Sequence, residues 1–584
     1  MTRFKVSIII LPLLLAACAH APQQASAEDD PEQHVMDMSA VLPGISGENA
    51  AESYPKMELD EKMLFTFLLS DIAEQRGRAD MAAQGYMELA KTTRDVRVVR
   101  RAAQLSLESR QMDQALEALQ MWQALEPQAV MPKQMLITVL VSGGKLEQAK
   151  PHLQELLAAD KKNAGHSIEK IYPLFARYSD KQAVYKMLRE LGQPYLNSAE
   201  TRWVLAQAAE AAGQHDDALD EARAARSLRP DWEWPVLLEA QILLVKNPSA
   251  AIALEKKFIE DYPDSNDVRL SYARILLEKK EYKESRKQFQ VLQSKQPANA
   301  ELAFAIALLS IQMGELDRAE KELKHTLEVG KRDSATVHYY LGQLNEAQKK
   351  EDVALQEYQQ VKDGEFIFSS RMRMAFLLVK ARKLKEAREI LQQTEARNPQ
   401  QQMQLILTEG QILRDAKEYD QSFKVLSHGL EKLPDQPDLL YEAAMVADKQ
   451  GKLEVVEEML RKLIKVEPEH AHAYNALGYA LLERRVRMKE AMQLVEKAYQ
   501  LAPDDAAIMD SMGWGYYLLG DLDKSLEFMR RAFTAFPDPE VAAHLGEVLW
   551  KKGKQAEAKI TWQDSLKSNP DSPVLKAIIK KFLP

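Results

Sequence analysis

The chain has 584 residues, 46% hydrophobic and 28% charged, which excludes general disorder and allows several domains or one long repeat array. Its formal net charge is −9, and no stripe of Lys and Arg with interleaved aromatic residues occurs, which argues against nonspecific binding of nucleic acid. The single cysteine, Cys18, excludes an intrachain disulfide framework and a cysteine-based metal site.

The first segment has the pattern of a secretion signal. Arg3 and Lys5 precede an apolar run, residues 6–15, that is too short to span a bilayer with confidence. The following Leu15-Ala16-Ala17-Cys18 resembles a bacterial lipobox, in which signal peptidase cuts before the cysteine and its thiol carries diacylglycerol. We therefore expect residues 1–17 to be a lipoprotein signal peptide and Cys18 to be lipidated. The alternative is an ordinary signal peptide with an incidental cysteine.

Lipidation would fix the location of the protein. Several buried acyl chains, at about 0.8 kcal/mol per CH₂, make membrane attachment effectively permanent. Ala19 follows the cysteine, and by resemblance to lipoprotein sorting the lack of Asp there favours the outer membrane, facing the periplasm. Residues 18–56 are rich in Ala, Gln, Asp, Glu, Pro, Ser and Gly without helical periodicity, so we expect a flexible tether. Its root-mean-square reach would be roughly 35 Å.

The stretch Asp510–Pro537 has the pattern of two short amphipathic helices. Gly520 and Asp521 lie at the turn between them, and Pro537 ends the pair because proline cannot continue a helix. Gly513 in the first helix and Ser525 in the second keep the two helices close. This 34-residue helix–turn–helix resembles the tetratricopeptide repeat.

The same pattern fills the rest of the chain. One small or β-branched residue recurs at fourteen consecutive spacings of 33 to 35 residues, and terminal prolines keep the same phase. The positions are Ala82, Ala115, Ala149, Ala183, Ala218, Ala251, Ser285, Ala319, Ala354, Ala387, Ser422, Val456, Ala491, Ser525 and Ala558. We predict an all-α superhelical solenoid of about fifteen such repeats over residues 57–570, with residues 571–584 as a C-terminal capping helix around Pro573–Phe582.

Two repeats depart from the pattern. The repeat around Ala183 lacks the turn glycine, and Pro173 interrupts its first helix. The repeat around Ala251 has Asn247-Pro248 at its turn. These departures indicate either bends in the solenoid or tolerated drift.

No pattern of catalytic or metal-binding residues emerges. The sequence contains no phosphate loop, no HExxH and no nucleophile elbow. His470 and His472 stand two residues apart, and such a pair points to different sides of a helix, which makes a poor metal site. We expect no catalytic residue, no metal and no cofactor. An enzyme with an unrecognised site stays open as the alternative.

The remaining function is binding. In this repeat class certain positions of the first helix face the groove of the superhelix. The aromatic residues at those positions are Trp203, Tyr339, Phe376, Tyr441, Tyr479, Trp514, Tyr517 and Trp550. They are either braces between neighbouring helices or anchors for a partner, because Trp and Tyr dominate binding hot spots. The charged residues Arg274, Glu346, Arg414, Asp448 and Glu547 occupy equivalent positions and would add charge selectivity.

Two segments carry a more specific resemblance. Leu68–Pro127 and Glu540–Trp562 are similar to the beginning and the end of proteobacterial tetratricopeptide outer-membrane lipoproteins. A member of that family binds and activates a periplasmic carboxyl-terminal processing protease and brings it substrates, including peptidoglycan hydrolases. The resemblance implies the same protein partners here. The lipobox-like segment adds a membrane contact through the lipid anchor, and the charge pattern argues against nucleic acid. The rival hypothesis is a scaffold for envelope assembly, such as polysaccharide export or pilus biogenesis, without a protease.

Overall fold

The computed structural model describes residues 55, 57–175, 178–330 and 333–583. In these residues the regular elements are 31 α-helices, α2 to α32, and two 3₁₀ helices, η2 and η3. The prediction of an all-α fold is confirmed. The expected signal peptide, Cys18 and nearly all of the expected tether lie outside the described residues. None of the described helices is long and apolar enough to cross a bilayer.

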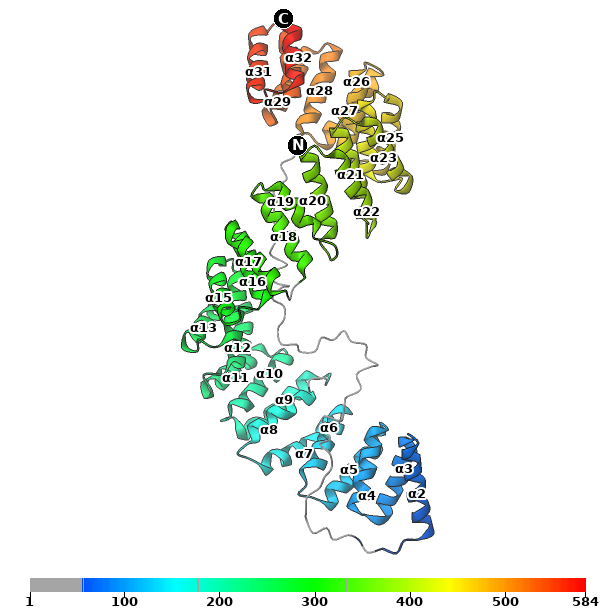
Figure 1. Ribbon diagram of the computed structural model, residues 1–584, viewed down its shortest axis with the longest axis vertical. Coiled ribbons are helices and arrows are strands. Elements are labelled where there is room, and N and C mark those ends of the chain that lie inside the picture. The colour runs from blue at the N-terminus through cyan, green and yellow to red at the C-terminus, as the bar shows by residue number, and fades with distance from the viewer. Residues whose placement is uncertain (1–54, 56, 176–177, 331–332, 584) are drawn as a thin grey trace. The chain divides into compact units, whose positions relative to one another are not determined.

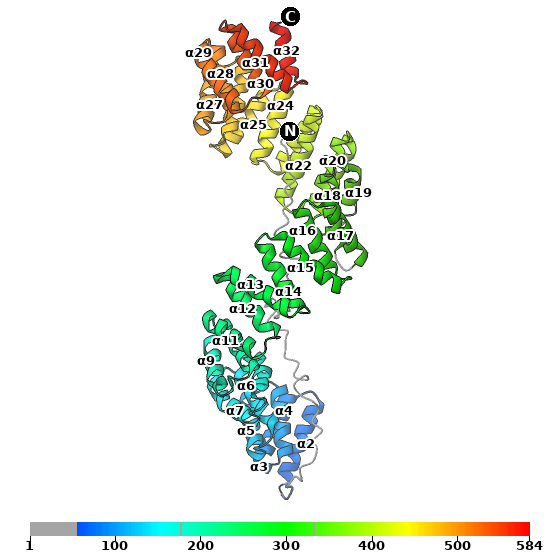
Figure 2. The same cartoon turned by 90° about the vertical axis from the view of Figure 1, so that its left-hand side faces the viewer.

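The chain forms two compact units, Met1–Arg332 and Asp333–Pro584. In the N-terminal unit consecutive helices pair into hairpins that follow one another in chain order (Figures 1 and 2). The helices are α2 (Glu61–Gln75), α3 (Ala79–Thr93), α4 (Val96–Glu108), α5 (Met112–Leu125), α6 (Val130–Ser142), α7 (Leu146–Ala159), α8 (Ala164–Ile171), η2 (Tyr172–Phe175), α9 (Lys181–Gly192), η3 (Gln193–Tyr195), α10 (Ala199–Ala211), α11 (His215–Leu228), α12 (Glu233–Lys246), α13 (Pro248–Asp261), α14 (Asn266–Glu278), α15 (Tyr282–Lys295), α16 (Ala300–Gln312) and α17 (Leu316–Val329).

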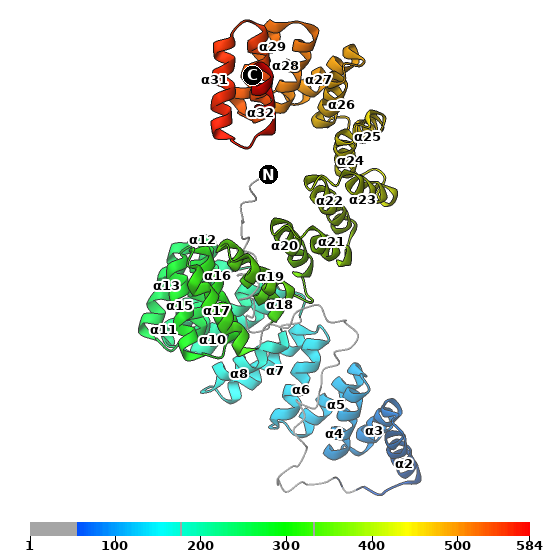
Figure 3. The same cartoon turned by 45° about the horizontal axis from the view of Figure 1, so that its top comes forward.

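The C-terminal unit continues the same pattern, and Figure 3 shows its hairpins in succession. Its helices are α18 (Ser334–Ala347), α19 (Glu351–Gln359), α20 (Ile367–Lys380), α21 (Leu384–Gln393), α22 (Pro399–Asp415), α23 (Tyr419–Lys432), α24 (Pro437–Lys449), α25 (Leu453–Val466), α26 (Ala471–Glu483), α27 (Met488–Leu501), α28 (Ala506–Leu519), α29 (Leu522–Ala535), α30 (Pro539–Lys551), α31 (Gln555–Ser568) and α32 (Pro573–Phe582). The single helix α32 packs against α30 and α31.

The recurring small residue sits where the two helices of each hairpin meet. Fourteen of the fifteen predicted positions are fully buried, with no exposed surface. The exception is Ala183, which is partly exposed. Its hairpin has a short first helix, because α8 ends at Ile171 and the chain continues as the 3₁₀ helix η2 around Pro173. Within it α8 and α9 pack mainly on α10 rather than on each other, so the departure in the sequence marks the repeat that does not form a regular hairpin.

Close approach of the two helices also explains a glycine in the first helix of several hairpins. A Cβ atom on Gly546 would lie 2.0 Å from Nε1 of Trp562, and one on Gly342 would lie 2.5 Å from Cε1 of Tyr358. Both aromatic side chains are fully buried. Each glycine thus makes room for an aromatic ring of the second helix.

The turn between the two helices uses a left-handed residue. In several hairpins it is glycine, as at Gly213 with φ of 72°. In six others it is a basic residue with φ between 54° and 65°: Arg110, Lys280, Lys349, Arg382, Lys417 and Arg485. These turns keep the same geometry without glycine, which explains why the sequence shows no turn glycine there.

Candidate protein-binding face

All eight aromatic residues that the sequence assigns to the groove lie on the first helices of their hairpins. Trp203 is on α10 of the N-terminal unit, and the other seven are on α18, α20, α24, α26, α28 and α30 of the C-terminal unit. Seven of the eight are half-buried. Phe376 on α20 is the exception, with 47% of its surface exposed. We call this set the first-helix aromatics.

A stacked cluster forms around Trp514 on α28. Its ring lies 4.9 Å from that of Tyr517 and 4.3 Å from that of His544 on α30, nearly parallel to both. Tyr479 on α26 stands 6.5 Å from the His544 ring. Three successive hairpins therefore contribute to one cluster, and Trp514 is held in place by its neighbours.

Beneath this cluster lies an ion pair between two largely buried groups. Nδ1 of His544 is 2.9 Å from Oδ2 of Asp510, to which it donates. Burial alone would disfavour the charged imidazolium, but the charge of Asp510 and its hydrogen bond outweigh burial and raise the pKa of His544. Burial, followed by the charges of nearby carboxylates, raises the pKa of the Tyr479 hydroxyl.

The cluster continues toward the C-terminal helix. The hydroxyl of Tyr517 donates to Oε1 of Glu547 at 3.2 Å, and Nζ of Lys581 on α32 donates to the same oxygen at 3.0 Å. Burial and the charge of Glu547 raise the pKa of Tyr517 to about 12, so its hydroxyl stays protonated and can donate. The helix α32 thus supports this end of the face as well as covering the core.

Apart from Phe376, the other first-helix aromatics are also braced by rings from neighbouring segments. Tyr339 stacks on Phe366 at 4.4 Å between centroids, and Tyr441 lies 5.7 Å from the His470 ring. The remaining contacts are Trp203 with Trp232 at 5.8 Å, and Trp550 with Trp562 at 5.9 Å and Phe582 at 5.5 Å. These aromatic residues therefore help to pack neighbouring helices together. Their rings are held in fixed positions and remain partly exposed.

The charged groove positions are mostly paired with the neighbouring hairpins. Glu346 pairs with Arg373, Arg414 with Glu442, Asp448 with Arg484 and Glu547 with Lys581. The fifth, Arg274, differs, because its Nε is buried without a hydrogen-bond partner. Since four of these charges are already neutralised within the protein, they give less charge selectivity than the sequence predicts.

Several residues that contact the first-helix aromatics were not identified from the sequence. Asp510 and His544 lie on the first helices of successive hairpins, α28 and α30, but one position apart in the register set by Ser525 and Ala558, so the register alone does not pair them. Phe366 precedes α20 and falls at no groove position. His470 is the N-cap of α26, where its Nδ1 accepts from the backbone N–H of Ala473 at 3.1 Å.

Neither histidine of the His470 and His472 pair joins a metal-binding group. In the described part of the chain no three His, Cys, Asp or Glu side chains gather as metal ligands would. The face consists instead of rigid aromatic rings, internal ion pairs and the exposed ring of Phe376. Fixed aromatic edges of this kind are suited to contacts with another protein, where Tyr and Trp carry much of the binding energy.

The chain is similar to tetratricopeptide repeat proteins in sequence. A tetratricopeptide repeat family model matches residues 246–300, 304–365 and 441–506. The TPR repeat-containing protein PA4667 of Pseudomonas aeruginosa is 32% identical over 508 residues, which cover 86% of this chain and 85% of that protein. The human protein O-mannosyl-transferase TMTC1 is 24% identical over 181 residues, 30% of this chain and 20% of that protein.

Two solved structures are similar to parts of the chain. The thermophilic TPR protein TTC0263 of Thermus thermophilus is 23% identical and covers 30% of this chain and 97% of its own, with a TM-score of 0.29. The Naa15/Naa10 structure bound to HypK-THB is 15% identical and covers 68% of this chain and 67% of its own, with a TM-score of 0.36.

Proposed function

The chain belongs to the tetratricopeptide repeat protein family, with PA4667 as a relative along most of its length, and on that basis we propose that it is a binding scaffold. Its specific role in this proposal is that of an adaptor. It holds a periplasmic carboxyl-terminal processing protease and the substrates of that protease, which include peptidoglycan hydrolases, on one repeat array. Holding both raises their effective concentration and so accelerates cleavage.

The observation that carries the binding role is the row of first-helix aromatics. Phe376 exposes nearly half of its surface, and the half-buried rings of Tyr479 and Trp514 are fixed by neighbouring side chains. Rigid rings lose little conformational entropy when a partner covers them, which favours their use as contact residues. The protease as the partner is supported by the resemblance of Leu68–Pro127 and Glu540–Trp562 to the adaptor lipoproteins.

The proposed location is the outer membrane, with the repeats in the periplasm. It is supported by the lipobox-like Leu15-Ala16-Ala17-Cys18 and by Ala19 after it. In this proposal acyl chains on Cys18 hold the protein at the membrane, and residues 18–56 connect the anchor to the first hairpin.

The experiment is a pull-down of the tagged chain from solubilised membranes, with Phe376→Ala as the variant of the binding face. We expect a carboxyl-terminal protease to be enriched with the wild type, and the variant to recover several-fold less of it. Because Phe376 is exposed, its loss leaves the helical circular dichroism signal unchanged. The matched control is Phe536→Ala, which removes another exposed phenylalanine, 61% accessible at the end of α29, outside the first helices.

Two outcomes would count against the proposal. If no protease is enriched by the wild type, the adaptor role is wrong. If Phe376→Ala and Phe536→Ala reduce recovery equally, the first-helix aromatics are not the contact surface.

A further inference from the structure

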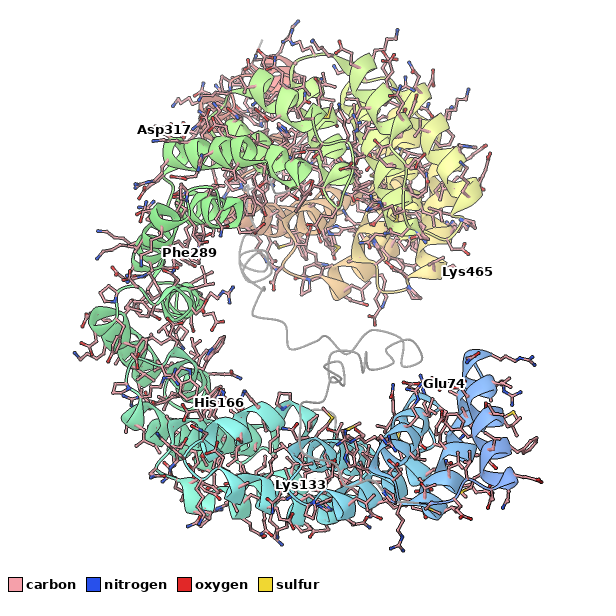
Figure 4. The ribbon with its side chains drawn as sticks, turned by 60° about the horizontal axis from the view of Figure 1, so that its bottom comes forward. Glu74, Lys133, His166, Phe289, Asp317 and Lys465 are labelled. Carbon is pink, nitrogen blue, oxygen red and sulfur yellow. The ribbon has the colours of Figure 1, made fainter. Side chains whose placement is uncertain are left out.

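The first described helix carries an unusual concentration of exposed apolar side chains. Of the 23 large hydrophobic residues that are exposed in the described part of the chain, nine lie between Met57 and Met81. Figure 4 shows the N-terminal unit with Glu74 of α2 at one end of its row of hairpins and Asp317 of α17 at the other. The apolar surface therefore belongs to the terminal hairpin.

Six of the nine lie on α2 itself, and three of these six form a continuous stripe. Phe65, Leu68 and Ile72 expose 66%, 49% and 46% of their surfaces. At 100° per residue the three lie within about 60° of one another, and Leu68 points away from Ser70 and Ala73, which are buried against α3. The stripe thus points away from the hairpin.

The same positions are covered in later hairpins. Counting from the small residue of each hairpin, Phe65, Leu68 and Ile72 correspond to Thr201, Val204 and Ala208 of α10, since Ala82 corresponds to Ala218. Those three residues of α10 are at most 2% exposed. Terminal repeats of soluble arrays normally present a polar outer face instead. The stripe on α2 is therefore a surface for another helix, with no preceding hairpin in the described residues to cover it.

The charges at the two ends of the stripe indicate what that helix is. Glu61 lies at the N-terminal end of α2, and Arg76 follows its C-terminal end. Both are exposed, and neither forms an ion pair within the described part of the chain. The middle residue of α2 is Leu68. In an antiparallel pair of identical α2 helices centred between Leu68 and Leu69, Glu61 of each copy approaches Arg76 of the other, and Phe65 approaches Ile72.

We infer that the stripe of Phe65, Leu68 and Ile72 is a homodimer interface, on which α2 of a second copy lies antiparallel with the twofold axis between Leu68 and Leu69. Self-complementarity is the requirement for such an isologous contact, and the stripe with its opposite end charges meets it. The inference stands whether or not the protein is a protease adaptor. A 15-residue helix is about 22 Å long, so the contact is smaller than a standard interface of about 800 Å² per partner and the dimer is reversible.

The first experiment is site-specific cross-linking of the purified full chain. Cys18→Ser removes the only native thiol, and Leu68→Cys places a thiol beside the proposed twofold axis. A short bis-maleimide should convert much of this variant into covalent dimer. The matched control is Ile560→Cys on α31, which is 59% exposed and should give monomer. Equal cross-linking at the two positions, or none at Leu68→Cys, would overturn the inference.

The second experiment is sedimentation equilibrium of the Cys18→Ser chain over a range of concentrations. Leu68→Glu should yield only monomer with unchanged helicity, because the side chain is exposed. Glu61→Arg and Arg76→Glu should each weaken dimerisation about 3- to 10-fold, and the double variant should restore it.

The charge-exchange variants distinguish a second copy of the chain from any other partner that could cover the stripe. A different protein, or the residues before α2, would not regain affinity when both charges are exchanged. If the wild type stays monomeric at every concentration, or if the double variant is weaker than either single one, the α2 stripe is not a dimer interface.

Discussion

At the scale of single residues, Glu255 is the least favourable side chain for its surroundings. It lies on α13 with no exposed surface, and neither carboxyl oxygen has a hydrogen-bond partner of normal geometry. Burial raises the pKa of Glu255 to about 8, and the nearby Ser271 hydroxyl offsets only part of this effect. The group is therefore largely protonated in the folded protein at neutral pH.

The buried carboxyl of Glu255 therefore makes the free energy of unfolding depend on pH, with lower stability at higher pH. The pKa of Glu255 is about 8 in the folded chain and close to its ordinary value of 4.5 when unfolded, so the contribution to stability is complete below pH 4.5 and is lost as the pH rises to about 8. We predict that Glu255→Gln raises the melting temperature, and that the increase is larger at pH 8 than at pH 5. The corresponding gain in the free energy of unfolding should differ between the two pH values by an amount on the order of a few kcal/mol.

The control for that measurement is Glu260→Gln, an exposed carboxylate on the same helix. Its melting temperature should follow the wild type at each pH. Parallel pH profiles for the wild type and Glu255→Gln would show that burial of this carboxyl does not limit stability.

At the scale of elements, several hairpin turns have a residue other than glycine in the left-handed position, where glycine has the lowest conformational cost. Lys280, between α14 and α15, has φ of 63°, and Gly213, between α10 and α11, has φ of 72°. A side chain in the left-handed region costs about 1 kcal/mol, which glycine avoids. A Cβ atom on Gly213 would meet no other atom within 4 Å, so the cost of adding one is conformational.

A reciprocal pair of substitutions tests this account of the turns. Lys280→Gly should stabilise the protein by about 0.5–1 kcal/mol, and Gly213→Ala should destabilise it by a similar amount. Thermal unfolding measured by circular dichroism would give both shifts. Destabilisation by Lys280→Gly would mean that the lysine side chain contributes more than its backbone strain removes.

The hairpins themselves could be predicted from the sequence because one physical requirement repeats. Two helices that cross closely need a small residue at the crossing, and the register of Ala82 to Ala558 reports that requirement fifteen times. The first-helix location of the aromatic residues follows from the same register. The irregular hairpin at Ala183 is visible too, because Pro173 cannot continue α8.

The details of the binding face could not be predicted in this way. Whether Trp514 is free or stacked depends on His544, a side chain of the next hairpin, and on the rotamers of both. The same holds for Tyr339, which rests on Phe366 from an inter-helix segment. The exposed stripe of α2 was missed because the same repeat positions are covered in other hairpins such as that of α10, so the repeat pattern alone does not mark them as exposed.

At the scale of the whole molecule, the proposed location requires the repeats to be held at the membrane by the anchor on Cys18. Cys18→Ser is predicted to release the protein into the soluble periplasmic fraction or to leave it unprocessed, because acyl chains could no longer be attached. Cell fractionation with immunodetection measures this directly. The matched control is Ala19→Ser, which changes the neighbouring residue but keeps the thiol and should stay with the outer membrane. Unchanged sedimentation of Cys18→Ser with the outer membrane would refute the lipobox.

The most direct test of the central claim is the rate at which a purified carboxyl-terminal processing protease cleaves a peptidoglycan hydrolase, measured with and without the Cys18→Ser chain. The adaptor proposal predicts a marked acceleration by the wild-type repeats, weaker acceleration by Phe376→Ala and full acceleration by Phe536→Ala. A cleavage rate that is the same with and without the repeats would contradict it.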